Sequence, residues 1–268
     1  LRVCLYTTVQ TGRYDPGMSD ETRRVIKDTS LPGGHERRSP DPAQWVNRSM
    51  LYYVGKAPGP YRPGPEFFDL ANEVVPSKQT LNGYDELYVI YQAVRNVAEL
   101  HGACAEVGVY RGGSAYFTAS AFEAMGLSPE FHAFDTFAGH PTVTDHDPGH
   151  EIGRFADTSY EAVKAYLARF PNVTVHHGDV TKLLPSVADS AYRLVNLDTD
   201  LYESTLACLR YFGPRMSPGG VVIVADYSAG KCPGVMEATT EYLQDAPERF
   251  QAWDQRTESL VLVKRATR

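Results

Sequence analysis

The chain is poor in cysteine, carries no excess of positive charge and has no long apolar run. Its 4 cysteines stand at positions 4, 104, 208 and 232, a spacing that matches no metal-binding or redox motif. Cys104 and Cys208 lie in apolar runs, which predicts thiols buried in a core. Cysteines used in this way are typical of a reducing compartment, so the cytoplasm is the expected location.

The charge and hydropathy exclude further classes of partner. A net charge of −7 argues against nucleic acid and against anionic membranes. The mean hydropathy is −0.34, and no apolar run approaches the length of a bilayer span, so a membrane-spanning protein is not expected. Residues 1–10 are too polar for a signal peptide.

The first 80 residues lack a clear periodic pattern. Proline and glycine clusters interrupt them at 31–34, 40–42 and 58–65. Short helices are expected at 20–28, 42–53 and 66–74, and a strand at 1–9. We interpret residues 1–80 as an irregular cap over a pocket mouth and residues 81–268 as the main domain. Five aromatic residues of the cap would either line an acceptor site or only pack: Tyr52, Tyr53, Tyr61, Phe67 and Phe68.

From residue 81 onward, helical and strand patterns alternate. Strands are expected at 103–109, 131–134, 173–176, 193–197 and 221–225, with helices at 85–100, from 114, and at 160–170, 182–187, 203–211 and 234–243. Strands at 250–253 and 260–263 would form an antiparallel hairpin at one edge. This order predicts an α/β fold with a Rossmann-like, mainly parallel seven-stranded sheet.

The loop after the strand at 103–109 lacks the residues of two common phosphate-binding motifs. A dinucleotide motif would need glycine at Tyr110, and a P-loop would need lysine at Ser114. The loop nevertheless holds Gly108 and Gly113, which let a backbone approach a ligand closely. The alternative is a glycine turn that only packs a helix against a strand.

Two acids beside this loop indicate which ligand it binds. Asp135 lies 135 − 113 = 22 residues after Gly113, a distance typical of an acid that binds ribose hydroxyls. Glu106 would repel phosphate but attract an ammonium or sulfonium group. S-adenosylmethionine carries a ribose and both cationic groups but no phosphate, so it is the predicted cofactor. Thr136 and Phe137, which follow Asp135, are expected to contact it as well.

Two further features leave alternatives open. Asp179 follows the third strand, where it would either accept a hydrogen bond from the adenine amino group or cap the next helix. The loop at 138–155 is long and contains His140, His146 and His150, and structureless loops of that length are usually functional. The three histidines would bind a metal, contact substrate or lie on the surface.

Three more acids follow two strands of the predicted sheet. Asp198 and Asp200 come after the strand at 193–197, and Asp226 comes after the strand at 221–225. In an open α/β sheet, ligands bind beyond the carboxyl ends of the strands. Carboxylates gathered there repel one another unless a cation compensates, and Mg²⁺ prefers oxygen ligands. The alternative is that Asp198 caps a helix and Asp226 caps a turn.

Several segments together resemble the macrocin O-methyltransferase family, which methylates sugar hydroxyls of bacterial natural products. They are EVGVYRGGS (106–114), FDTFAG (134–139), RFADTS (154–159), LDTDLYEST (197–205) and SPGGVVIVADY (217–227). The resemblance covers about residues 80–245 and implies the class I methyltransferase fold, S-adenosylmethionine and Mg²⁺. By this resemblance Asp198 is both general base and metal ligand, Asp226 is a further ligand, and Glu106, Ser114, Asp135 and Asp179 hold the cofactor.

One position departs from the family pattern, which has two acids before the tyrosine after the fifth strand. Here the residues are Ala225, Asp226 and Tyr227, so one ligand is missing, and Asp200 or water would complete the metal shell. We expect a homo-oligomeric O-methyltransferase acting on a glycosylated small molecule. A phenolic or catechol-like acceptor and a non-catalytic cofactor-binding subunit are the alternatives.

Overall fold

The computed structural model describes residues 65–187, 189–246, 250–255 and 257–266. All of them belong to one compact unit of the chain. The expectations for a strand at 1–9, for helices at 20–28 and 42–53, and for Tyr52, Tyr53 and Tyr61 lie outside the described residues. The cap therefore remains a prediction.

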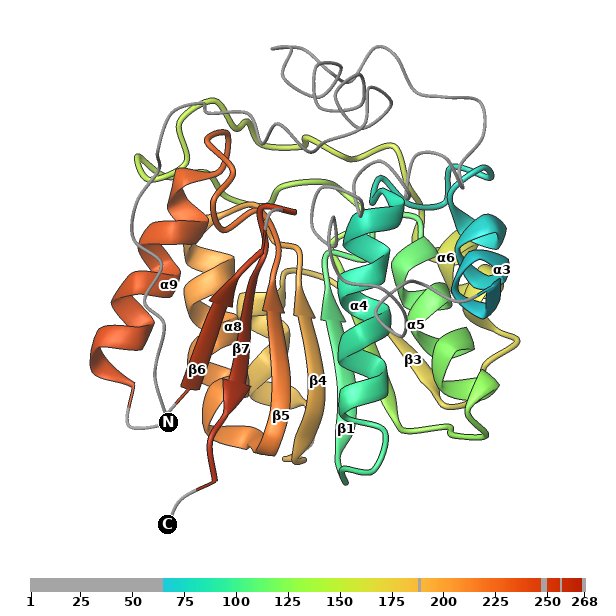
Figure 1. The fold of residues 1–268 in the computed structure, drawn as a ribbon. Helices are drawn as coiled ribbons and strands as arrows, with labels where there is room; N and C mark the ends of the chain where they lie inside the picture. The colour runs from blue at the N-terminus through green and yellow to red at the C-terminus, as the bar shows by residue number, and fades with distance from the viewer. Residues whose placement is uncertain (1–64, 188, 247–249, 256, 267–268) are drawn as a thin grey trace, which may run out of the picture. The chain divides into compact units, whose positions relative to one another are not determined.

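The described strands form a single seven-stranded sheet in the order β3-β2-β1-β4-β5-β7-β6 (Figure 1). Strands β1 to β5 pair in parallel, whereas β7 runs antiparallel to both β5 and β6. The predicted parallel sheet with an antiparallel edge hairpin is confirmed. The strands are β1 (Ala103–Val107), β2 (Phe131–Asp135), β3 (Val173–His177), β4 (Tyr192–Leu197), β5 (Met216–Val224), β6 (Phe250–Asp254) and β7 (Leu260–Lys264).

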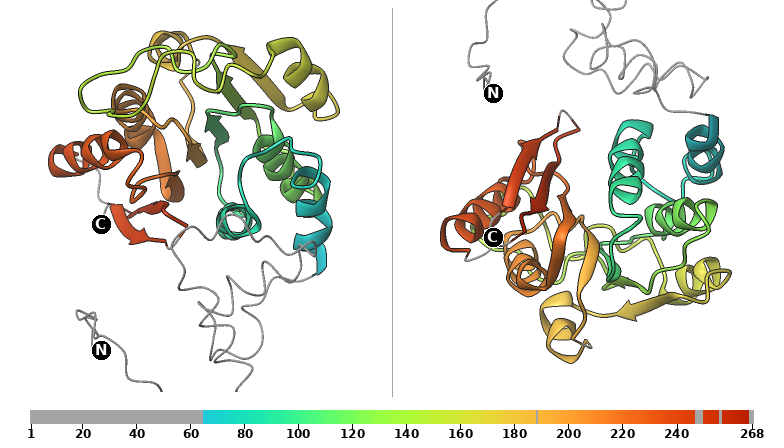
Figure 2. Two further views of the ribbon diagram at one scale, coloured as in Figure 1. Left: turned by 90° about the horizontal axis from the view of Figure 1, so that it is seen from above. Right: turned by 60° about the horizontal axis from the view of Figure 1, so that its bottom comes forward.

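Helices cover both faces of the sheet. Helices α3, α4 and α5 pack together on one side, and α8 packs against α9 on the other (Figure 2). Burial from both sides explains why all five residues of β1 are buried. No helix within the described ranges is both long and apolar enough to cross a bilayer. The helices are α3 (Pro65–Val74), α4 (Tyr84–Asn96), α5 (Gly113–Ala124), α6 (Tyr160–Leu167), α7 (Val180–Leu183), α8 (Tyr202–Arg215) and α9 (Pro233–Asp245).

Helix α3 belongs to the packed core although it precedes residue 81. The ring of Phe67 is fully buried and meets Phe117 of α5 edge to face, with ring centroids 6.0 Å apart. Packing is therefore the role of Phe67, one of the aromatic residues for which two roles were open. Cys104 and Cys208 are also fully buried free thiols, as predicted.

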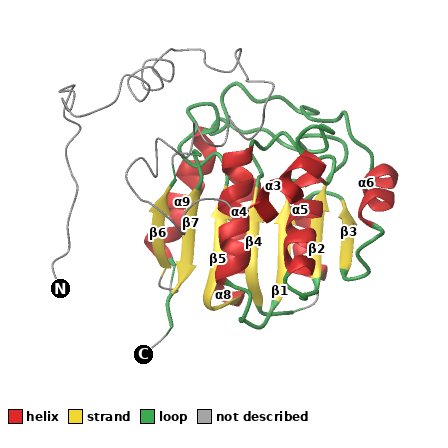
Figure 3. Ribbon diagram, turned by 45° about the vertical axis from the view of Figure 1, so that its right-hand side comes forward, coloured by secondary structure: helices red, strands yellow, loops and turns green. Residues whose placement is uncertain are grey.

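The carboxyl ends of β1 to β5 open onto one edge of the sheet, where the long connections gather (Figure 3). Several non-glycine residues at this edge have left-handed backbone: Tyr110 after β1, Phe137 after β2, Asp200 after β4 and Asp226 after β5. Such conformations cost free energy and cluster at functional sites. This edge is where a site is expected.

Candidate functional site

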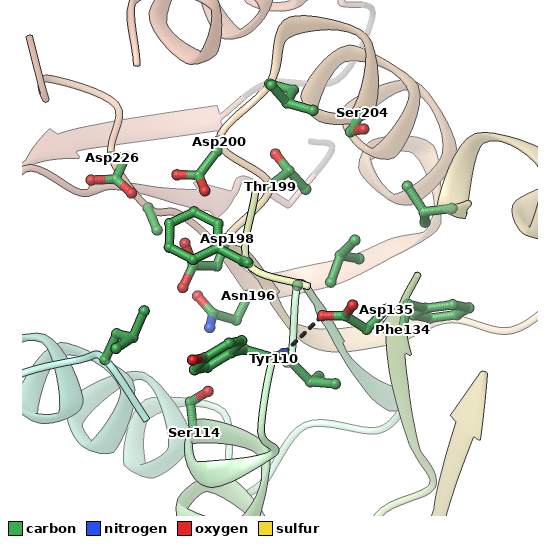
Figure 4. Close-up of a pocket in the computed structure, with 18 of the residues that line it drawn as sticks. Tyr110, Ser114, Phe134, Asp135, Asn196, Asp198, Thr199, Asp200, Ser204 and Asp226 are labelled. Atoms are coloured by element: carbon green, nitrogen blue, oxygen red, sulfur yellow. Dashed lines mark hydrogen bonds between the residues drawn. The ribbon is translucent and has the colours of Figure 1, made fainter. Parts of the chain in front are cut away.

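A cavity of about 210 Å³ lies at this edge, between the strand ends, the start of α4 and the 138–155 loop. Polar side chains from three strand ends point into it (Figure 4). Among the predicted site residues, its wall includes Gly108, Ser114, Asp135, Thr136, Asp198, Asp200 and Asp226, whereas Glu106, Gly113, Phe137 and Asp179 lie outside the wall.

Asp135 ends β2 and organises both neighbouring loops. The backbone N–H of Tyr110 donates to its Oδ2 at 2.8 Å, and the N–H of Phe137 donates to its Oδ1 at 2.7 Å (Figure 4). Burial raises the pKa of this carboxyl, although the two backbone donors oppose the shift. Each oxygen keeps a second lone pair, so the carboxylate is positioned to accept from ligand hydroxyls.

Glu106 stands behind the cavity wall. Ser114 Oγ donates to its Oε1 at 2.5 Å, while its buried Oε2 has no hydrogen-bond partner among the described residues. Burial raises the pKa of Glu106 to about 7. Asn196 of β4 sits opposite Glu106 in the sheet register and lines the cavity. An orphaned, buried acceptor of this kind suits a cationic or proton-donating group.

The two loop glycines are required by protein packing. A Cβ on Gly108 would lie 1.8 Å from the carbonyl oxygen of Asp198, and Gly108 has a φ of +87°. A Cβ on Gly113 would lie 2.5 Å from the carbonyl carbon of Gln79. Gly108 also lines the cavity, whereas Gly113 serves the packing of α5 against the chain before α4. The close approach predicted for these glycines therefore involves the protein backbone itself.

Three predicted cofactor contacts have other partners in the structure. Thr136 lines the cavity, but its hydroxyl donates to the carbonyl of Gly139 at 2.6 Å. The Phe137 ring packs on Tyr160, with ring centroids 5.6 Å apart. Asp179 caps α7 by accepting from Thr181 N at 3.0 Å, which is the capping alternative left open by the sequence. A role of Asp179 toward adenine remains a prediction.

Asp198, Asp200 and Asp226 gather at the other end of the cavity (Figure 4). Burial raises the pKa of Asp198 well above its usual range, and the charges of Asp200 and Asp226 add to this. Asp198 does not cap α8, whose N-cap residue is Leu201. Asp226 does begin a turn, because Ala229 N donates to its carbonyl at 3.1 Å, but its side chain remains on the cavity wall.

Basic groups already accompany two of the three acids. His140 Nε2 lies 3.2 Å from Asp200 Oδ2, and Lys231 Nζ lies 3.3 Å from Asp226 Oδ1. Burial alone would raise the pKa of Asp200, but the hydrogen bond and charge of His140 bring it below its usual range. Within the described chain, no lysine, arginine or histidine forms an ion pair with Asp198. Asp198 is thus the acid with the highest proton affinity in the group.

The 138–155 loop is fixed to the rest of the domain by its polar residues. The buried carboxylate of Asp147 accepts from the backbone N–H of Tyr202, the first residue of α8, at 2.8 Å. His146 pairs with Glu237 at 2.6 Å, and His150 Nε2 lies 2.9 Å from the carbonyl of Lys231. The three loop histidines therefore have separate partners, and only His140 lines the cavity.

The macrocin O-methyltransferase (TylF) family model matches residues 70–249. The chain belongs to the macrocin O-methyltransferase family. The resemblance seen in its motifs is thereby confirmed.

Two curated relatives are also O-methyltransferases by name. An 8-demethyl-8-(2,3-dimethoxy-alpha-L-rhamnosyl)-tetracenomycin-C 4'-O-methyltransferase of Streptomyces olivaceus is 33% identical over 49% of this chain and 55% of the relative. A mycinamicin III 3''-O-methyltransferase of Micromonospora griseorubida is 28% identical over 53% of this chain and 60% of the relative. The chain thus spans little more than half the length of these two relatives.

Solved structures show the same fold. The O-methyltransferase NovP is 23% identical with a TM-score of 0.60, over 84% of this chain and all of that one. The calicheamicin methyltransferase CalS11 is 21% identical with a TM-score of 0.60, over 85% of this chain and 94% of that one. The class I methyltransferase fold is therefore confirmed for this member of the macrocin O-methyltransferase family.

The magnesium site implied by the family does not fit the donor atoms found here. The described residues bring together ligand atoms of Asp200, Asp226 and Cys232, within 4.8 Å of one another, and this group does not include Asp198. Burial raises the pKa of the Cys232 thiol, and a protonated sulfur is a poor ligand for a hard cation. Ala225 contributes a methyl group to the wall. Magnesium binding therefore stays a prediction of the resemblance.

Sequence reasoning assigned no role to several residues of the cavity wall, among them Glu86, Asn196 and Lys231. Asn196 carried a signal, because it is an amide inside an otherwise apolar strand. Glu86 is half-buried at the start of α4, and its removal from water raises its pKa to about 7. Its role depends on where α4 packs, which no local pattern indicates.

Proposed function

We propose that this chain is an S-adenosylmethionine-dependent O-methyltransferase that methylates a sugar hydroxyl of a bacterial secondary metabolite. One relative is named for 4'-O-methylation of a rhamnosyl-tetracenomycin and another for 3''-O-methylation of mycinamicin III, which supports this class of acceptor. The observation that carries the proposal is the place of Asp198. This half-buried acid lies on the cavity wall and has no basic partner among the described side chains.

The cofactor would bind at the end of the cavity near β1 and β2. S-adenosylmethionine, when bound, supplies an electrophilic methyl group on sulfur. Asp135 would accept hydrogen bonds from the ribose hydroxyls, and Gly108 leaves its part of the wall free of a side chain. Glu106 would attract the positive charge of the ligand, since its Oε2 is buried and unpaired within the described structure. These donors and acceptors fit a ligand with a ribose and a cation.

Asp198 would take the proton from the acceptor hydroxyl. Its raised pKa makes it a stronger base than an exposed aspartate, once it is ionised. Asn196, Thr199 and Ile223 form the cavity wall around it. Because the magnesium donor set does not fit, no step here depends on a metal ion. A cytoplasmic, homo-oligomeric enzyme is part of the same proposal.

Asp198→Asn tests the base directly, because it keeps the shape of the side chain and removes its charge. Methyl transfer from S-adenosylmethionine would be measured on a panel of glycosides and phenols, which also tests the phenolic alternative. The rate should fall about 10²–10⁴-fold, while cofactor affinity should survive. Asp189→Asn is the matched control, since Asp189 pairs with Arg215 on the surface. Turnover above about a tenth of wild type in Asp198→Asn would rule out the base role.

A further inference from the structure

Hydrogen bonds of the surrounding turn and of the 138–155 loop fix the backbone position of Lys231. It lies in the turn between β5 and α9, directly before Cys232, whose backbone N–H donates to Ala229 at 3.0 Å. The carbonyl of Lys231 lies 2.9 Å from His150 Nε2, so the 138–155 loop fixes the same residue from the other side. The side chain therefore starts from a defined position beside the cavity.

The ammonium of Lys231 reaches the acidic end of the cavity. Its Nζ lies 3.3 Å from Asp226 Oδ1, and the residue lines the cavity wall. The side chain is 65 % exposed, which places the charge at the mouth rather than in the interior. An acceptor that enters through the mouth would meet this cation before it meets Asp198.

A cation at this position compensates the negative charge of the carboxylates around it. Four carboxylates, those of Glu86, Asp198, Asp200 and Asp226, line this end of the cavity, and each raises the proton affinity of the others unless a positive charge intervenes. Lys231 supplies that charge to Asp226, whereas Asp200 has the imidazole of His140 at 3.2 Å. Besides the carboxylate of Asp200, Asp226 has the thiol of Cys232 near it, and the preceding residue is Ala225; neither a thiol nor a methyl group is a good ligand for a hard cation.

We propose that Lys231 is the built-in counter-cation of this acidic site, and that the chain performs its reaction without a divalent metal ion. The inference depends on the proposed methyltransferase function for its activity test but not for its metal-binding test. When Asp198 takes the proton of the acceptor hydroxyl, the oxygen becomes negative, and the Lys231 ammonium offsets that charge at the cavity mouth. Lys231 thus takes the place that a metal ion would have in this corner of the site.

Metal binding can be measured without any acceptor. Wild type, Lys231→Met and the double variant Ala225→Asp/Lys231→Met would be titrated with Mn²⁺ and followed by electron paramagnetic resonance. Wild type should show no saturable binding up to about 1 mM Mn²⁺. The double variant gains a carboxylate beside Asp226 and loses the competing ammonium. It should therefore bind Mn²⁺ at least roughly tenfold more tightly than wild type. Wild type binding Mn²⁺ as tightly as the double variant would overturn the proposal.

Turnover provides the second measurement. Wild-type methyl transfer should be unchanged by EDTA, and Lys231→Met should lower kcat roughly tenfold with unchanged affinity for S-adenosylmethionine. Lys231→Arg, which keeps the charge, should recover most of the rate, and Lys164→Met controls for loss of a lysine on α6. Loss of wild-type activity in EDTA with recovery in Mg²⁺ would overturn the proposal. Absence of product under every metal condition would instead refute the methyltransferase function, and the Mn²⁺ titration would still decide the role of Lys231.

Discussion

Glu106 is a buried acid whose ionisation should make the protein less stable as the pH rises. Burial raises its pKa from 4.5 to about 7, against the opposing effects of Ser114 and Asn196. Below the unfolded pKa the carboxyl is neutral in both states, so it does not disfavour folding. Above the folded pKa it is charged in both states, and the folded state bears the cost of a buried charge. The contribution of Glu106 to the free energy of unfolding is therefore lost as the pH rises through about 7.

The size of this loss follows from the pKa difference. Each unit of difference corresponds to about 1.4 kcal/mol, so the shift in Glu106 amounts to about 3 kcal/mol. Glu106→Gln removes the titration and keeps an oxygen for Ser114. Urea unfolding of wild type and variant would be compared at about pH 5 and about pH 8. The free energy of unfolding of the variant, relative to wild type, should rise by about 3 kcal/mol between these two values.

The control for this test is a variant that removes an exposed carboxylate instead of the buried one. Glu161→Gln removes one negative charge from the exposed start of α6 and controls for the change in net charge. A difference between Glu106→Gln and wild type that stayed constant with pH, within about 0.5 kcal/mol, would refute the assignment of Glu106 as a buried, titrating carboxyl. The unpaired Oε2 would then have lost its significance for ligand binding.

Two further predictions concern Asp135, which lines the cavity, and Asp147, which binds the start of α8. Asp135→Ala should weaken binding of S-adenosylmethionine by about 1.5–3 kcal/mol in calorimetry, because hydrogen bonds to a charged group are lost; unchanged affinity would place the ribose elsewhere. Asp147→Ala should lower the free energy of unfolding by about 1–2 kcal/mol, because the first N–H of α8 loses its acceptor. The exposed neighbour Asp145 provides the control Asp145→Ala, and an equal effect of both changes would contradict the capping role of Asp147.

The order of elements and the edge that carries the site could be predicted from the sequence, because both depend on local patterns. Apolar runs locate β1 to β5, and the carboxyl ends of parallel strands must share one edge. Asp135 and Asp198 follow such strands directly, so their places on the cavity wall were predictable. Asn196 stands in β4 two residues before Asp198, so the amide among Leu194, Val195 and Leu197 could have been recognised as a further wall residue.

Contacts between distant parts of the chain could not be predicted in this way. Asp147 binds the start of α8 across 55 residues, and Lys231 meets His150 across 81. Both contacts depend on how a long loop folds back, for which the sequence has no periodic signal. Asp179 shows the opposite case, because capping of α7 uses a residue two positions away and was one of the two roles expected for it.

The backbone at the site explains why one acid is so central. Tyr110 and Phe137 both adopt left-handed backbone, with φ of 50° and 51°, which is unfavourable for aromatic residues. Each donates its N–H to a different oxygen of Asp135. Charge-assisted bonds of about 1.5–3 kcal/mol each are of the size needed to offset about 1–3 kcal/mol of strain per residue. Asp135 thus shapes the two loops that border the end of the cavity where we propose that the cofactor binds, and a ligand that bound there would meet loops already held in position.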